Sequence, residues 1–401
     1  MADTNFAALT SEEKTIWAKD TWSMARNLSF MNKFAGKGSN SVVQRVTELR
    51  EDEKGARAVI TLVADMTSDG VAGDYEVEDN EEALVARDTV IRVDQLRNGN
   101  RLAGRMADQK SVVEFRTNSR DQLAYWLSDR CDQMAFLMMS GVDFRLKTNG
   151  GFRPGFSHNG SAWARNTSVA PVGRALYDLE FAADVTAPSS NRYFRWDAST
   201  GLEAGDITAV SSADVLTYET LVRLKAKAKD KFIRGVKDKN GKEYYHVFVT
   251  PRGMADLRLD SNYLSNVRNA GVRGDSNELF TGADSVTVDG LIIHEYRHVY
   301  NTIGATAGSS GTDAGKIGYK WGSSGNVDGQ RVILAGAQAL AFADIGNPIW
   351  DERNHFDYGN KKGIAFGKIT GFLKPKFYSP VDDTNEDFGL LVCDVALSTN
   401  N

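Results

Sequence analysis

Two histidines and a glutamate carry the most obvious chemical potential of the chain, in the segment HEYRH at residues 294–298. On a helix, the two histidines would share one face and hold a single Zn²⁺, while the glutamate acted on a bound water. Residues 286–288 and 291–293 are typical of strands, in which positions four apart are separated by roughly 13 Å and share no metal. No glutamate follows Glu295 until Glu352, so the third ligand is missing from its expected neighbourhood. We predict no metal site and keep a zinc-dependent hydrolase as the alternative function.

The other motifs that suggest catalysis are incomplete. Residues 311–316, GTDAGK, resemble a phosphate-binding loop, but Ser310 stands where the first glycine is required, and Ile317 stands where a hydroxyl would bind magnesium. The sequence contains no nucleophile elbow and no paired-cysteine metal motif. The remaining histidines are isolated in the sequence and are expected to be ordinary polar residues: His158, His246 and His355. The sequence therefore predicts neither a cofactor nor an enzyme.

Composition narrows the class of protein without naming a function. The chain has 401 residues, of which 41% are hydrophobic, so it can form two or three compact units. Its 48 basic and 53 acidic side chains give a formal charge of −5, which lacks the basic excess that general nucleic-acid binding favours. Cys131 and Cys393 are expected to be buried free thiols, which fits a reducing compartment. No signal peptide or membrane-length apolar run is present, so we expect a cytoplasmic chain without a membrane partner.

A long two-stranded arm is predicted. Its strands are the strand-forming segments 58–64 and 85–96, and the polar, glycine-containing residues 68–82 connect them. A two-stranded ribbon is marginal in water by itself, so we expect it to lie on another copy of the chain. The polar segment carries an acidic cluster that is either solvated or in contact with basic side chains of a neighbour: Asp74, Glu76, Glu78, Asp79, Glu81 and Glu82. Arginines on the returning arm are predicted to pair with acidic surface of a neighbour: Arg87, Arg92, Arg97, Arg101 and Arg105.

A long amphipathic helix follows the arm. It is predicted to begin near residue 118, with Asn118 or Ser119 as the cap, and to end at Gly141. Apolar residues recur at steps of three and four along one stripe, which predicts one buried face: Leu123, Leu127, Cys131, Met134 and Met138. Core packing is favoured over a methionine-lined ligand groove.

The N-terminal 45 residues are polar with scattered aromatic residues, which is typical of an arm. Trp17 and Trp22 either anchor in a pocket of a neighbour or fold back on their own subunit. Both readings stay open on sequence alone. The two tryptophans are therefore candidate inter-subunit contacts.

A second unit is predicted from about residue 211. It opens with a helix at 213–232, capped by Ser211 or Ser212, whose alternating basic residues indicate a solvated helix end rather than a nucleic-acid patch. Asn240-Gly241 is a hairpin signal before a strand at 244–249. The later elements are expected to be a helix that starts at Pro251 and strands at 286–300 and 332–342.

The order of these parts resembles the major capsid proteins of tailed phages, and within them those of podoviruses of the coliphage N-four type. The resemblance covers nearly the whole chain, and its specificity lies in the order and spacing of its segments. The segments that carry it are GVAGD at 70–74, VDQLR at 93–97, LAYWL at 123–127 and VTPRGMADL at 249–257.

The resemblance implies an α+β fold of the Hong Kong 97 type. Its parts would be an N-terminal arm (1–45), an extended loop (46–112), a peripheral domain with the spine helix (113–210 and 355–401) and an axial domain (211–354). Subunits would form hexamers and pentamers of an icosahedral virion capsid around double-stranded DNA, with portal and decoration proteins as further partners, assembled in the host cytoplasm. The covalent crosslink of one branch needs a loop lysine, and Lys54 and Lys110 lie only near the loop's base, so no crosslink is expected. A non-viral self-assembling or binding protein is the remaining alternative.

Overall fold

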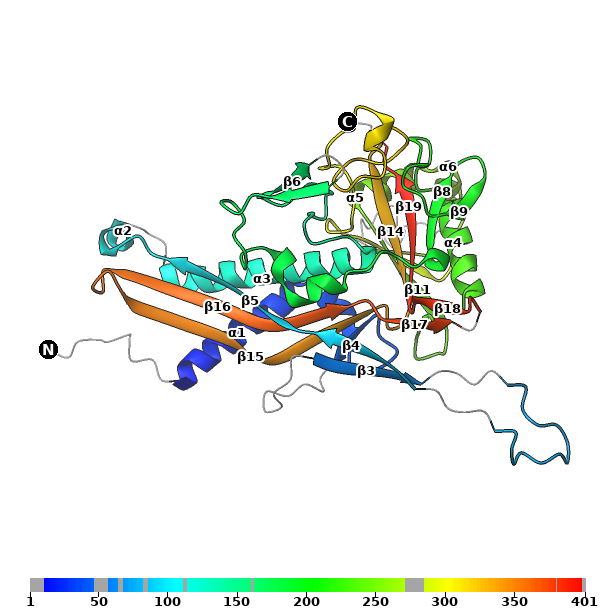
Figure 1. Cartoon of the computed structure of the whole chain (residues 1–401), viewed down its shortest axis with the longest axis horizontal. Helices are drawn as coiled ribbons and strands as arrows, with labels where there is room; N and C mark the ends of the chain where they lie inside the picture. The colour runs from blue at the N-terminus through cyan, green and yellow to red at the C-terminus, as the bar shows by residue number, and fades with distance from the viewer. Residues whose placement is uncertain are drawn as a thin grey trace.

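The fold is elongated, and one long helix lies beside a long β-hairpin for much of its length (Figure 1). A computed structural model describes residues 11–46, 57–63, 68–81, 86–110, 114–159, 162–270, 285–379 and 381–398. The α-helices are α1 (Ser11–Leu28), α2 (Arg105–Lys110), α3 (Phe115–Ser140), α4 (Tyr218–Asp230), α5 (Pro251–Leu259) and α6 (Ser261–Ala270). Short 3-10 turns are η2 (Met31–Phe34), η3 (Leu176–Asp178), η4 (Glu180–Asp184), η5 (Ser190–Arg192) and η6 (Gly311–Asp313). Across these described ranges, none of the helices combines the length and apolar character that crossing a membrane requires.

Two mixed sheets meet at the C-terminal end of α3. The five-stranded sheet has the order β1 (Ala35–Gly36), β2 (Val43–Val46), β15 (Leu340–Phe356), β16 (Lys361–Leu373) and β5 (Asp94–Arg101). The eight-stranded sheet has the order β12 (Ser285–Val288), β13 (Leu291–Glu295), β11 (Glu243–Val249), β14 (Gly329–Ala335), β19 (Leu390–Ala396), β8 (Tyr193–Asp197) and β9 (Gly201–Ala204), with β10 (Val236–Lys237) beside β11. Three separate ribbons pair β3 (Arg57–Val63) with β4 (Ala86–Arg92), β6 (Phe156–Asn159) with β7 (Ala162–Arg165), and β17 (Lys376–Ser379) with β18 (Thr384–Asp387). The predicted combination of helices and sheets is confirmed.

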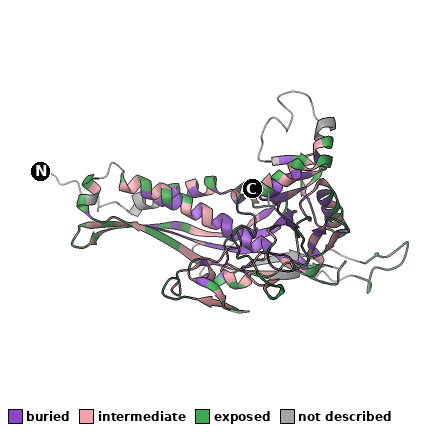
Figure 2. Cartoon of the chain, turned by 90° about the horizontal axis from the view of Figure 1, so that it is seen from above, coloured by how far each residue is buried: buried purple, intermediate pink, exposed green. Residues whose placement is uncertain are grey.

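Helix α3 is the spine of the fold, and its sequence explains its position. The predicted apolar stripe is buried, as expected, but residues 131–140 are buried on every side of the helix. The prediction of one buried face is therefore wrong for the second half of α3, because this half enters the junction of the two sheets (Figure 2). The predicted cap is also wrong: Glu114 precedes the first turn, and Ser119 is already buried in the helix.

Gly141 ends α3 as predicted, in the left-handed conformation with φ of 64°. An added Cβ would lie 2.5 Å from the backbone oxygen of Thr186 and 2.8 Å from Cδ of Pro188. We expect Gly141→Ala to lower the free energy of unfolding by at least about 2 kcal/mol, since the left-handed backbone alone costs 1–2 kcal/mol. Gly173→Ala is the matched control, because its φ is also positive but its Cβ would have open space. Urea unfolding of both variants measures the difference, and equal losses would contradict this account.

The helix predicted at 213–232 is shorter than expected. Helix α4 begins at Tyr218, and Thr217 caps it by accepting a hydrogen bond from the Thr220 backbone at 3.3 Å. Residues 211–216 are held in another conformation, because the buried carboxylate of Asp214 accepts backbone hydrogen bonds from Ser211 and Ala198. The predicted hairpin at Asn240-Gly241 and the helix from Pro251 are confirmed.

Two segments that were predicted to be single continuous strands are interrupted in the structure. The segment 286–300 forms β12, a two-residue turn and β13, and strand structure ends at Glu295. The segment 332–342 crosses from one sheet to the other, because strand structure stops between β14 and β15, where Gln338 has a φ of 57°. The returning arm at 85–96 is likewise divided, since β4 pairs with β3 while β5 pairs with β16.

Candidate functional site

The segment 294–298 is structural in this fold, and it does not bring its two histidines together. His294 lies on β13, as predicted, but His298 lies beyond the strand, which the prediction of a continuous strand missed. Nε2 of His298 is 2.8 Å from Oδ1 of Asp129 on α3, and the Tyr296 hydroxyl donates to Oδ2 of Asp132 at 2.5 Å. In the part of the chain that the structure describes, no group of three or more potential ligands could hold a metal ion.

His246 was expected to be an isolated polar residue, and this prediction is wrong. Strands β11 and β13 run in parallel, so Nδ1 of His246 lies 2.9 Å from Nε2 of His294. Phe34 packs edge-on against both rings, with centroids 5.2 Å and 4.9 Å away. Burial lowers the pKa of both histidines from 6.5 to about 4, and for His294 the charges of His246 and Lys33 add to the effect.

We expect this histidine pair to make the subunit sensitive to acid. Between about pH 6.5 and pH 4 the unfolded chain binds protons that the native pair excludes, so the free energy of unfolding falls as the pH drops through this window. Denaturant unfolding at pH 7, 5.5 and 4.5 measures the slope. The double variant His246→Phe/His294→Phe should show a shallower slope, and an unchanged slope would place the acid sensitivity elsewhere.

Asp132 fixes the N-terminal residues 11–46, here called the strap, to the spine helix. Its carboxylate accepts hydrogen bonds from Oγ of Ser29 at 2.6 Å and from the backbone nitrogens of Phe30 and Met31 at 2.9 Å and 3.2 Å. With the Tyr296 hydroxyl, four donors converge on one buried carboxylate. The strap, the spine and the eight-stranded sheet therefore meet at Asp132.

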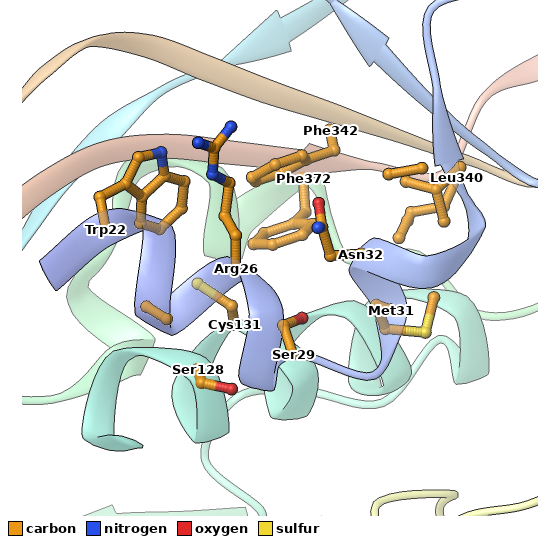
Figure 3. Close-up of a pocket in the computed structure, with 13 residues that line it drawn as sticks. Trp22, Arg26, Ser29, Met31, Asn32, Ser128, Cys131, Leu340, Phe342 and Phe372 are labelled. Atoms are coloured by element: carbon orange, nitrogen blue, oxygen red, sulfur yellow. The ribbon is translucent and has the colours of Figure 1, made fainter. Parts of the chain in front are cut away.

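A small apolar cavity lies under the strap (Figure 3). Its volume is about 30 Å³, which is about the space of one water molecule. The cavity is lined mainly by apolar side chains from α1, η2, α3 and the hairpin β15–β16: Trp22, Met31, Cys131, Leu340, Phe342 and Phe372. Burial raises the pKa of the Cys131 thiol, so this side chain acts as a small apolar group. The predictions that Cys131 and Cys393 are buried and free are confirmed.

The two strap tryptophans pack on their own subunit. Trp22 is 8% exposed, and Nζ of Lys368 lies 5.1 Å from its ring centroid. The ring centroid of Trp17 is 6.1 Å from that of Trp350, and the Arg116 guanidinium lies 4.2 Å from the Trp17 centroid. Both tryptophans therefore fold back on their own subunit, and Trp22 has little surface left for a neighbour. A contact of the half-buried Trp17 with a neighbouring copy stays a prediction.

The predicted arm is present as the ribbon β3–β4, which pairs seven residues on each side. Residues 69–81, here called the arm tip, extend beyond the ribbon and away from the body of the molecule (Figure 1). Asp74, Glu76 and Glu78 are exposed, and Tyr75 and Val77 between them are 81% and 60% exposed. Lys54 and Glu82 lie outside the described residues, as does the side chain of Arg87.

The five arginines that were predicted to act together are distributed over different elements. Arg92 is on β4, and its Nη1 lies 3.7 Å from Oδ1 of Asp184 in the same subunit. Arg101 is on β5 with its guanidinium 4.6 Å from the Phe356 ring centroid, and the exposed Arg105 begins α2. Arg97 on β5 is exposed and lines a groove.

This groove, here called the arginine groove, has a volume of about 730 Å³. Strand β5, helix α3 and residues 153–156 and 169–179 line it. The groove contains four arginines from four separate segments: Arg97, Arg130, Arg153 and Arg174. Of these four, the sequence predicted only Arg97 as a contact residue. Arg130, Arg153 and Arg174 are far from it along the chain and follow no common spacing.

The two acidic residues of the arginine groove are already engaged. Asp178 forms two 2.6 Å hydrogen bonds with the Arg165 guanidinium, which holds the pKa of that carboxyl below its usual range. Asp94 accepts hydrogen bonds from the backbone nitrogens of Gln95 at 2.6 Å and Glu180 at 3.0 Å. The arginine groove therefore has a positive electrostatic potential and suits an anionic partner.

Burial lowers the pKa of Arg153 to about 10, and the nearby charge of Arg130 adds to this effect. Arg153 still carries its proton at neutral pH. Arg153 and Arg130 both donate to Oε1 of Gln133, at 3.0 Å and 2.8 Å. These two arginines therefore form the fixed floor of the groove. Arg97 and Arg174 are the exposed charges at its edges.

Known proteins match the chain along almost its whole length. A family model described as phage capsid protein matches residues 5–399. The major capsid protein of Pseudomonas phage KPP25 is 52% identical over 391 residues, which are 97% of this chain and 96% of that protein. The capsid of Ralstonia phage GP4 superposes with a TM-score of 0.69 at 21% identity, covering 93% of this chain and 92% of that one. The capsid asymmetric unit of cyanophage Pam1 superposes with a TM-score of 0.64 at 17% identity, covering 100% of both chains. At these identities the two structures share a fold with this chain.

Proposed function

This chain belongs to the phage capsid protein family and is a major capsid protein, a structural component of the virion rather than an enzyme, and we propose that its arm drives assembly of an icosahedral shell. The observation that carries this proposal is the ribbon β3–β4. Among the described strands it pairs with no third strand, and it ends in an exposed acidic tip. Such a ribbon is marginal in water unless another surface covers it. The subunit's own core covers Ile91 near the end of β4, and in a shell neighbouring copies would supply a surface for the exposed tip.

The shell that we propose consists of hexamers and pentamers of subunits with the Hong Kong 97 type of fold, and it encloses double-stranded DNA without reading its sequence. Closed symmetry lets one subunit type make many equivalent contacts, and modest contacts add through multivalency. The net charge of −5 is consistent with a container that encloses DNA without holding it tightly. Portal and decoration proteins would be further partners, with assembly in the host cytoplasm.

We propose the domain organisation that the resemblance implied, with its borders moved where they divide paired strands. The border at 354/355 would divide the hairpin β15–β16, in which Arg353 pairs with Gly363. A border between β14 and β15 keeps this hairpin in the peripheral domain, with α3 beside it. The segment of the axial domain that starts at residue 211 then ends near residue 336, after β14. Strands β8, β9 and β19 join the axial domain by the same criterion, because they belong to the same eight-stranded sheet as β14.

Assembly is testable directly with the purified chain. Electron microscopy and light scattering over a range of concentrations and salt should show rings of five or six subunits, or closed shells, above a threshold concentration. A chain that stays monomeric under all conditions, including co-expression with the other head proteins of its phage, would contradict the proposed function.

A further inference from the structure

The arm tip and the arginine groove are complementary in charge and in polarity. The tip contains acidic residues and no basic one: Asp69, Asp74, Glu76, Glu78, Asp79 and Glu81. The groove presents four guanidinium groups, while both of its carboxylates are engaged. Exposed apolar side chains occur on both surfaces, with Tyr75 and Val77 in the tip and Val169, 59% exposed, at the groove.

The arm cannot place its tip in the groove of its own subunit. Strand β4 separates the tip from β5, and its seven residues span roughly 23 Å when extended. The tip also points away from the body of the molecule, beyond the end where β5 enters the five-stranded sheet (Figure 1). An acidic tip in the groove would therefore have to come from a second copy of the chain.

We infer that the arginine groove is the acceptor for the acidic arm tip of a neighbouring copy. This inference rests on the proposed function and names the residues that meet. Arg97 and Arg174 are exposed at the groove's edges and are free to turn toward the carboxylates of Asp74, Glu76 and Glu78. Arginine suits this role, because its planar guanidinium binds carboxylates through two parallel hydrogen bonds. Such charge-assisted pairs fix the register of an interface and exclude wrong partners.

A synthetic peptide of residues 69–81 tests the inference independently of shell formation. Fluorescence anisotropy with the purified subunit should show binding that weakens as salt rises. The variant Arg97→Glu/Arg174→Glu should weaken binding at least tenfold, because like charges then face each other. The control Lys239→Glu/Arg252→Glu changes the net charge equally at exposed positions away from the groove lining and should bind as the natural chain does.

A charge exchange tests the same contact in the assembly. The groove variant and the tip variant Asp74→Lys/Glu76→Lys should each raise the threshold concentration for shells about tenfold or more. A chain with all four substitutions should recover assembly, because the opposite charges meet again. Equal peptide binding by the natural chain and the groove variant, or no peptide binding at all, would overturn the inference while shells of the natural chain would still support the proposed function. Binding of a short DNA duplex in place of the peptide would make the groove a nucleic-acid site and also overturn it.

Discussion

Arg331→Met is expected to lower the free energy of unfolding by about 3–5 kcal/mol, because it leaves a buried carboxylate without its counter-charge. Nε and Nη2 of Arg331 on β14 lie 2.7 Å and 2.9 Å from the two oxygens of Asp394 on β19. Nη1 of Arg331 donates to the backbone oxygen of Ser140 at 2.6 Å, so the same side chain fixes the end of the spine helix. Burial disfavours the charged guanidinium, but the Asp394 carboxylate outweighs burial and raises the pKa of Arg331.

Denaturant unfolding measures this loss in the free energy of unfolding, and two further variants identify its cause. Arg353→Met removes an exposed pair with Asp351 and should cost less than about 1 kcal/mol. The double variant Arg331→Met/Asp394→Leu should recover part of the loss, since the unpaired charge is gone. A double variant that is no more stable than Arg331→Met would show that packing, rather than the buried charge, dominates at this site.

Excision of residues 70–80, with a short glycine-serine turn in their place, is expected to abolish shell formation while the subunit stays folded. The ribbon β3–β4 is a sheet of its own, so shortening its tip leaves both large sheets intact. Each copy would lose one contact, but a shell multiplies that loss over all its subunits, because the contacts act together. Light scattering should report subunits at concentrations at which the natural chain assembles.

Circular dichroism and thermal unfolding provide the control for this variant. The folded body should unfold at nearly the same temperature as in the natural chain. Normal shells from the shortened chain would show that the arm tip is dispensable and that assembly depends on other surfaces.

The local elements were largely predictable from the sequence, because their signals lie within a few residues. Gly141 ends the spine helix, Pro251 begins α5, and Asn240-Gly241 forms the turn of a hairpin. The errors arose where tertiary contacts override local preference. Asp214 holds its neighbours out of helix α4, and the apolar run at 332–342 conceals a change from one sheet to the other.

The candidate site was predictable only in part. The acidic tip could be predicted because its charged residues lie close together in the sequence, and it is exposed. The groove could not be predicted from the sequence, because β5, α3 and two loops bring its arginines together only in the folded chain. The pair His246–His294 was missed for the same reason, since 48 residues separate the two rings along the sequence. Long-range contacts of this kind have no periodicity that a single sequence reveals.

A cryo-electron microscopy reconstruction of the assembled shell, at a resolution that shows side chains, would show directly where the arm tip lies. We expect density for residues 69–81 of one subunit inside the arginine groove of its neighbour, with acidic side chains against Arg97 and Arg174. An arm tip that lies against its own subunit, or against a neighbour at another surface with the groove open to solvent, would contradict it.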